Sequence, residues 1–105
     1  MEDYKRDFIK FAFENGLRVF ENSDEDRTLK NKRISPWFLN VGDFNDGATL
    51  DVLTKSYSDA IIDSINSGIK IDSLYGIPEK GVTLVGPTST AMAAKEHNVR
   101  WFFTR

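Results

Sequence analysis

The sequence has 105 residues, enough for one small domain with a thin hydrophobic core. Its net charge of −2 and pI near 5.3 argue against a general nucleic-acid binder, which normally carries a basic excess on one face. The absence of cysteine excludes disulfides, thiolate zinc sites and cysteine nucleophiles. The N-terminus is too charged for a signal peptide and the apolar stretches are too short to span a membrane, so we expect a cytoplasmic protein.

The first part of the chain predicts one helix followed by short strands. Asp3 can cap a helix over residues 4–15, whose Phe and Ala side chains recur at helical spacing. Short strands are expected at 17–20, 28–30 and 37–41. The polar segment 22–27 and the Gly-, Asp- and Asn-rich segment 42–47 predict loops. Residues 1–45 would therefore form an N-terminal helix and a small hood.

The second part predicts alternating helices and strands. A stripe of Leu, Tyr and Ile side chains indicates a long helix that faces a core and ends at Gly68. The expected elements are a helix over 48–66, a buried strand over 69–75, a helix that ends near 97 and a strand over 99–103. This order predicts an α/β fold with a parallel sheet and flanking helices, in which 46–105 begin the core. Residues 1–105 form a single domain in this interpretation.

Pro87 falls inside the segment expected to form the second helix. A proline in a helix interior costs about 3 kcal/mol, because it removes a hydrogen bond and clashes with the preceding turn. Gly86 precedes it, which favours a place at the first helical position. We therefore expect the regular helix to begin near Pro87 or to be kinked there.

A cluster of three cations lies between the expected strands of the hood. Lys30, Lys32 and Arg33 fall within four residues, ahead of a Ser-Pro break. Such a cluster can hold an anion, with lysine as a point charge for phosphate. A solvated charged turn is the alternative interpretation.

An aromatic and apolar run, Trp37-Phe38-Leu39, follows that break. Neighbouring residues of a strand face opposite sides, so one ring should enter the core and the other a binding site. A flat ring beside cations suits a ligand that is both planar and anionic. The alternative is that both rings pack in the core or the hood.

The segment 76–81 reads Gly-Ile-Pro-Glu-Lys-Gly and joins an expected strand to a helix. Glycines let the backbone approach a phosphate, and the amides of a helix N-terminus attract anions. It is not a Walker motif, because Gly81 follows Lys80 where that motif has Ser or Thr. An ordinary strand-to-helix turn is the alternative, and Lys80 is the candidate binding residue.

The remaining polar residues do not predict a catalytic or metal site. His97 is the only histidine, and a surface role at a helix end suits it. Loop solvation and helix capping account for Asp43, Asp46 and Asp51, and no Ser-His-Asp arrangement can be argued.

Together, four motifs resemble orotate phosphoribosyltransferase, a type I phosphoribosyltransferase of pyrimidine biosynthesis. They are the opening helix at 4–12, Thr28-Leu29-Lys30 with Ser35-Pro36-Trp37-Phe38, the loop at 76–82, and Phe103-Thr104-Arg105. They occur in the family's order over essentially the whole chain. The resemblance implies a glycosyltransferase that moves a phosphoribosyl group from phosphoribosyl pyrophosphate to orotate, giving orotidine 5′-phosphate and pyrophosphate.

The same resemblance implies roles for individual residues and partners. The substrate-binding residues would be Lys30, Phe38, Leu39, Lys80 and Arg105. Lys30 would reach both substrates, and Phe38 would pack on the orotate ring. Lys80 would contact pyrophosphate, as would Arg105 in a site shared across a homodimer. Mg²⁺ would accompany the pyrophosphate, and no residue is assigned as a general base.

The chain differs from the family pattern at two positions, and it lacks the segments that carry two of the family's functional loops. Glu79 replaces the loop tyrosine, and because like charges repel we expect its carboxylate to point away or to meet a cation. The basic loop lacks the glycine that usually precedes the arginine at position 33. The family's 5-phosphate cradle and catalytic loop would lie beyond Arg105, so we expect an N-terminal portion that is inactive alone. A non-catalytic domain that binds a small anion or a protein is the alternative function.

Overall fold

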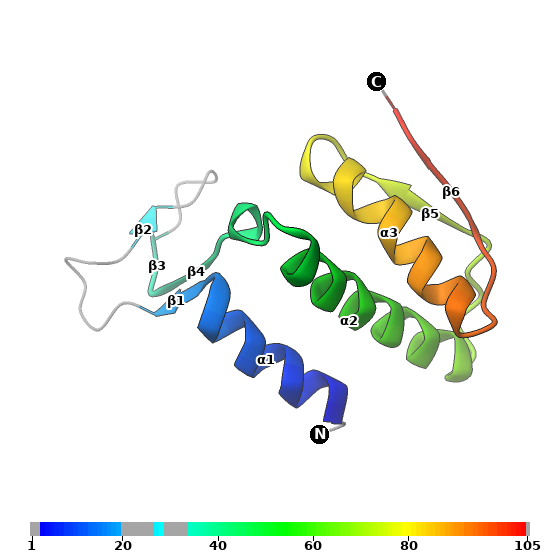
Figure 1. The fold of residues 1–105 in the computed structure, drawn as a ribbon, viewed down its shortest axis with the longest axis horizontal. Helices are drawn as coiled ribbons and strands as arrows, with labels where there is room; N and C mark the ends of the chain where they lie inside the picture. Colours follow the sequence, from blue (N-terminus) through cyan, green and yellow to red (C-terminus); the bar gives the residue numbers. More distant parts are fainter. Residues whose placement is uncertain (1–2, 20–26, 29–33, 105) are drawn as a thin grey trace.

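The computed structural model describes residues 3–19, 27–28 and 34–104 (Figure 1). Its elements are α1 (Asp3–Asn15), β1 (Leu17–Val19), β2 (Arg27–Thr28), β3 (Ile34–Ser35), β4 (Trp37–Leu39), the 3-10 turn η1 (Val41–Asp43), α2 (Gly47–Asn66), β5 (Ser73–Gly76), α3 (Lys80–Ala94) and β6 (Arg100–Phe103). None of the described helices has the length and apolar character that crossing a membrane requires. The expected turn before Arg27 and the three clustered cations lie outside the described residues.

The N-terminal part is a helix with a small antiparallel hood. Strand β1 pairs with β4, with Leu17 opposite Leu39 and Val19 opposite Trp37. Strand β2 pairs with β3, a two-residue strand that the sequence interpretation placed in the basic loop. Helix α1 packs against both β1 and α2, which confirms the predicted helix and hood.

The C-terminal part is a β-α-β unit with a parallel pair of strands. Strand β5 pairs with β6 in parallel, from Ser73 opposite Arg100 to Gly76 opposite Phe103. Helix α3 connects them and packs against both strands and α2 (Figure 1). The predicted parallel α/β arrangement is therefore confirmed. Leu53 of α2 and Met92 of α3 are fully buried.

Two expected strands have different limits in the structure. The strand expected over 69–75 is shorter and shifted to β5, and Gly76 is its only buried residue. Ile69, outside the strand, is largely exposed, because β6 is the only strand that pairs with β5 among the described residues. The strand expected to reach Val41 stops at Leu39. There the Asn40 side chain accepts a hydrogen bond from the Gly42 N–H at 3.2 Å, which turns the chain into η1.

Of the two alternatives for the second helix, a start near Pro87 is wrong, and a kink at Pro87 stays a prediction. Helix α3 begins at Lys80, and Pro87 lies inside it. Buried side chains on both sides of the proline, from Val85 to Met92, hold the helix against the core, and this packing offsets the cost of the missing N–H. Two hydroxyls near the proline donate to backbone carbonyls of the same helix, Ser89 Oγ to Gly86 O at 2.7 Å and Thr90 Oγ1 to Pro87 O at 2.8 Å.

The predicted extent of the long helix is confirmed by α2, which spans Gly47–Asn66. Asp46 caps its start. The Thr49 N–H donates to Asp46 Oδ1 at 2.8 Å, and the Thr49 hydroxyl donates to the same oxygen at 2.6 Å. These hydrogen bonds favour the carboxylate form, led by that from the Thr49 side chain, so the pKa of Asp46 falls below its ordinary value of 3.8. The helix ends at Asn66, and Gly68 follows as predicted.

The cap predicts a specific dependence of stability on pH. Because the folded-state pKa of Asp46 is lowered, the unfolded chain binds its proton more readily in acid. The stabilisation by Asp46 is therefore complete above the unfolded pKa and is lost as the pH falls below 3.8 through the folded pKa. Urea unfolding at several pH values should show a steeper acid loss in the wild type than in Asp46→Asn, which keeps an acceptor but does not titrate. Parallel pH curves for the two proteins would contradict this role.

Candidate functional site

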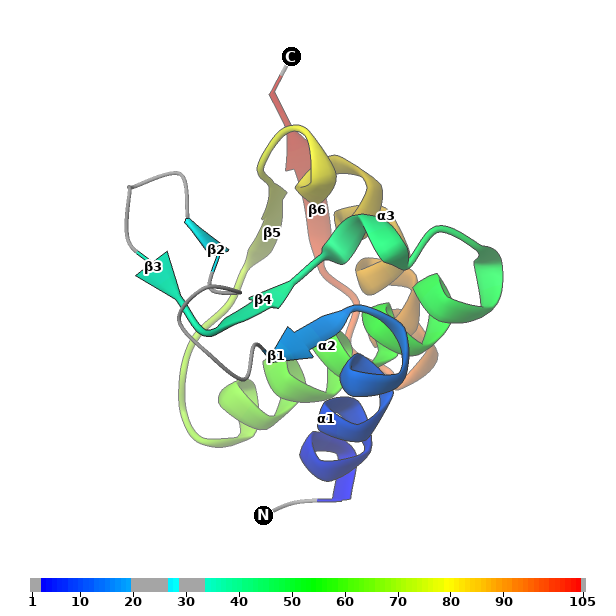
Figure 2. The ribbon, with the colours of Figure 1, turned by 90° about the vertical axis from the view of Figure 1, so that its left-hand side faces the viewer.

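The segment between β5 and α3 forms the candidate anion site. In a parallel sheet, ligands bind outside the carboxyl ends of the strands, and this segment lies at the carboxyl end of β5. The end of β6 lies on the same side (Figure 2). A cavity of about 480 Å³ is lined there by Ile77, Pro78, Glu79, Lys80 and Gly81. The segment predicted to bind an anion is therefore hollowed and open.

Close backbone packing fixes the shape of this segment. A Cβ atom on Gly76 would lie 2.7 Å from both the Gly81 carbonyl oxygen and Val85 Cγ1, closer than real Cβ contacts allow. A glycine at position 76 therefore lets the end of β5 touch the first turn of α3. The contact places Lys80 beside the end of β5, at the N-terminus of α3. The partial positive charge of that helix N-terminus adds to the charge of the Lys80 ammonium.

Lys80 and Glu79 present opposite charges at this cavity. Both side chains are exposed, and Lys80 is the first residue of α3. Glu79 precedes the helix, but its side chain makes no capping hydrogen bond to it. The expectation that this carboxylate points away or meets a cation stays a prediction.

Strand β4 separates the aromatic residues of the hood. Trp37 and Leu39 line an apolar groove against α1, together with Phe8 and Phe13. Alternation along the strand puts Phe38 on the other face, and Phe38 is not among the residues that line this groove. Trp37 nevertheless remains 55% exposed, so it does not enter a closed core.

The predicted site residues divide into three groups. Lys80 approaches η1, the turn that directly follows the strand bearing Phe38. Leu39 lies on the α1 side, away from the face of Phe38. Lys30 and Arg105 lie outside the described residues. The structure therefore places the aromatic strand and the lysine on neighbouring elements, and leaves the binding roles of all five residues as predictions.

Sequence reasoning did not select the turn of Asn40 and Gly42, whose Gly42 lies near the side chain of Lys80. Their signal was an Asn-x-Gly sequence directly after the aromatic strand, which is typical of a tight turn. Their nearness to Lys80 depends on the tertiary fold, so no local pattern could reveal it.

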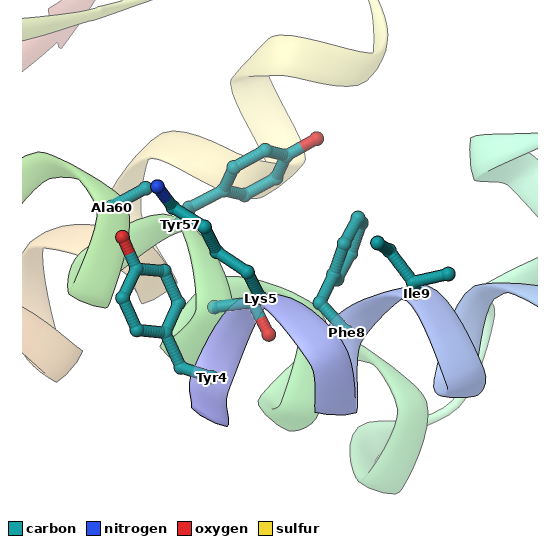
Figure 3. Close-up of a pocket in the computed structure, with 7 residues that line it drawn as sticks. Tyr4, Lys5, Phe8, Ile9, Tyr57 and Ala60 are labelled. Atoms are coloured by element: carbon teal, nitrogen blue, oxygen red, sulfur yellow. The ribbon is translucent and has the colours of Figure 1, made fainter. Parts of the chain in front are cut away.

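A second cavity, of about 370 Å³, lies between α1 and α2 (Figure 3). The side chains of Phe8 and Ile9 from α1 and Tyr57 from α2 face this space. Burial raises the pKa of the Tyr57 hydroxyl. These largely apolar and aromatic walls do not suit a polyanion, so the segment before α3 stays the candidate anion site.

No family model matches the chain, but curated proteins resemble it over its whole length. Orotate phosphoribosyltransferase of Pseudomonas aeruginosa is 41% identical over 106 residues, which cover 100% of this chain and 46% of that protein. The Pseudomonas fluorescens protein of the same name is 42% identical over 108 residues, with the same coverage. The chain thus spans about half the length of the curated relatives it matches.

A solved structure gives the same result for the fold. The 1.9 Å crystal structure of orotate phosphoribosyltransferase from Francisella tularensis matches with a TM-score of 0.74 and 40% identity, over 93% of this chain and 45% of that one. The parallel β-α-β unit with its hood therefore has the type I phosphoribosyltransferase-like fold that the sequence predicted. The resemblance to the orotate phosphoribosyltransferase family is confirmed, and the chain fits the N-terminal portion of such a protein.

Proposed function

We propose that this chain carries two substrate-binding elements of an orotate phosphoribosyltransferase. These are strand β4, whose Phe38 binds orotate, and the segment 76–81, whose Lys80 binds pyrophosphate. The parent reaction transfers a phosphoribosyl group from phosphoribosyl pyrophosphate to orotate. The similarity of the whole chain to enzymes of that name supports the proposal. The observation that carries it is the place of Lys80, at the helix N-terminus that follows the carboxyl end of β5.

In the proposed mechanism, the chain's residues act by charge and by position. The bond from the anomeric carbon to pyrophosphate breaks as the bond from that carbon to the orotate nitrogen forms, through a ribosyl cation-like state. The Lys80 ammonium and the N-terminus of α3 stabilise the negative charge that develops on the leaving pyrophosphate. Phe38 holds the orotate plane so that its nitrogen faces the anomeric carbon. The orotate nitrogen is deprotonated before attack, so no general base is required.

The proposal also includes the two residues outside the described segments, a metal and a partner subunit. Lys30 would contact both substrates, and Arg105 would bind pyrophosphate across a homodimer. The described residues contain no group of three or more His, Cys, Asp or Glu side chains that could hold a metal. The family resemblance implies that Mg²⁺ would accompany the substrate pyrophosphate, and no step above depends on it.

Homodimer formation and a cytoplasmic location complete the proposal. The rings of Tyr75 and Phe102 meet in a tilted contact on the β5–β6 pair, with their centroids 5.1 Å apart, and both remain about half exposed. An open sheet with exposed apolar side chains favours pairing with another chain. Light scattering should detect an assembly larger than one 12.0 kDa chain.

Phe38→Ala is expected to weaken orotate binding. Stacking of a base on an aromatic ring contributes about 1–3 kcal/mol, so the affinity should fall roughly 5- to 150-fold by calorimetry. Trp37→Ala is the matched control, because it removes the neighbouring ring on the opposite face of β4. Equal losses in the two variants would contradict the assignment of Phe38. A folded chain that binds neither orotate nor phosphoribosyl pyrophosphate would favour the non-catalytic alternative.

A further inference from the structure

The turn after β4 meets the side chain of Lys80, far away in the sequence. A Cβ atom on Gly42 would lie 3.7 Å from Lys80 Nζ, 4.0 Å from Lys80 Cε and 3.2 Å from Asn40 Oδ1. The lysine ammonium and the Asn40 amide oxygen therefore flank the same point above the bare backbone of Gly42. The two ribbon views agree, because η1 lies beside the start of α3 in both (Figures 1 and 2).

This turn is held firmly by its own hydrogen bonds. The Asn40 N–H donates to the Gly16 carbonyl oxygen at 2.9 Å, which ties the turn to the end of α1. The Asn40 side chain accepts from the Gly42 N–H at 3.2 Å and donates to Asp43 Oδ1 at 3.0 Å. The turn is therefore fixed from both its backbone and its side chain.

The residue that follows the turn anchors it in the core. Phe44 is only 6% exposed, and its ring packs on that of Phe11 in α1, with the ring centroids 5.3 Å apart. The turn is therefore packed against α1 through Phe44, while its Gly42 lies near Lys80.

The geometry points to the Asn40–Gly42 turn as the element that positions the Lys80 ammonium for pyrophosphate. This inference rests on the proposed role of Lys80 as a pyrophosphate ligand. A lysine side chain has many rotamers, and a wall that restricts them lowers the entropy lost when the ammonium binds. The turn directly follows β4, so the same wall would set the ammonium relative to the strand that bears Phe38.

Gly42→Ala tests this inference without straining the backbone. Gly68 is the only described glycine with a positive φ, so alanine fits the backbone of position 42. The added methyl group would press on Asn40 Oδ1 and occupy space beside the ammonium. Gly47→Ala is the matched control, because a Cβ atom at position 47 would meet nothing within 4 Å.

The binding experiment is a double-mutant cycle on the 105-residue chain, with inorganic pyrophosphate titrated by calorimetry. Gly42→Ala should weaken binding about 2- to 12-fold, the range for immobilising one side chain. In a Lys80→Ala background the same substitution should have no effect, because positioning acts only through the lysine. Gly47→Ala should leave the affinity unchanged. An equal loss from Gly42→Ala in both backgrounds would overturn the inference and leave Lys80 as a pyrophosphate ligand.

A measurement on the ligand-free chain separates failure of this inference from failure of the proposed function. A nuclear Overhauser effect between the Gly42 Hα and Lys80 Hε protons is expected, and its absence would overturn the positioning role. If Lys80→Ala leaves the pyrophosphate affinity unchanged, the proposed role of Lys80 fails and the positioning role fails with it. The observed Overhauser effect would then report packing alone.

Discussion

Lys80→Ala is expected to lower the affinity of the chain for pyrophosphate by about 10- to 150-fold. A hydrogen bond to a charged group contributes about 1.5–3 kcal/mol, and the variant removes both the charge and the donors. The helix N-terminus and the backbone of the loop remain, so some binding should persist. Calorimetry with inorganic pyrophosphate measures the effect directly.

Lys55→Ala provides the control for loss of one positive charge. Lys55 is exposed on α2 and forms an ion pair with Asp51 at 2.8 Å, four residues earlier. Exposed pairs of this kind contribute about 0–1 kcal/mol to stability, so the variant should fold normally. Its pyrophosphate affinity should match that of the wild type. A similar loss in both variants would mean that net charge, and not the loop, attracts the anion.

Leu53→Ala is expected to lower the free energy of unfolding by about 2–5 kcal/mol, the range for removing a fully buried leucine side chain. Leu53 has no exposed surface, and it lies in α2, which packs on α1 and α3. Small domains are stable by only about 5–15 kcal/mol, so this single change would remove a large share of the total. The urea midpoint should fall accordingly.

Val52→Ala is the matched control for the core substitution. Val52 is the neighbouring residue of the same helix and is 40% exposed. Its replacement removes apolar atoms and the β-branch but leaves no closed cavity, so the change should be within about 1 kcal/mol. Comparable losses at positions 52 and 53 would contradict the packing of α2 described above.

Local patterns predicted the long elements well. The extent of α2 followed from its apolar stripe and from Gly68 after it, both of which act within a few residues. The parallel pair of strands followed from the strand-helix-strand order. The start of α3 could not be predicted, because packing on both sides of Pro87 outweighs the local preference of proline.

The individual residues of the candidate site could be predicted from the sequence, but their arrangement in space could not. The loop sequence indicated Lys80, and alternation along a strand separated Phe38 from Trp37. The contact of Lys80 with the turn at Gly42 joins two segments that no sequence motif connects. The orientation of Leu39 toward α1 likewise depends on how β4 packs, and the family resemblance alone did not provide it.

The most direct test of the proposed function is a residue-by-residue map of ligand binding by nuclear magnetic resonance. The ¹⁵N-labelled 105-residue chain would be titrated with phosphoribosyl pyrophosphate and then with orotate. We predict that phosphoribosyl pyrophosphate shifts the amide signals of 77–82 and that orotate shifts those of 37–42. Shifts confined to the apolar cavity between α1 and α2, or no shifts in a folded chain, would contradict the account.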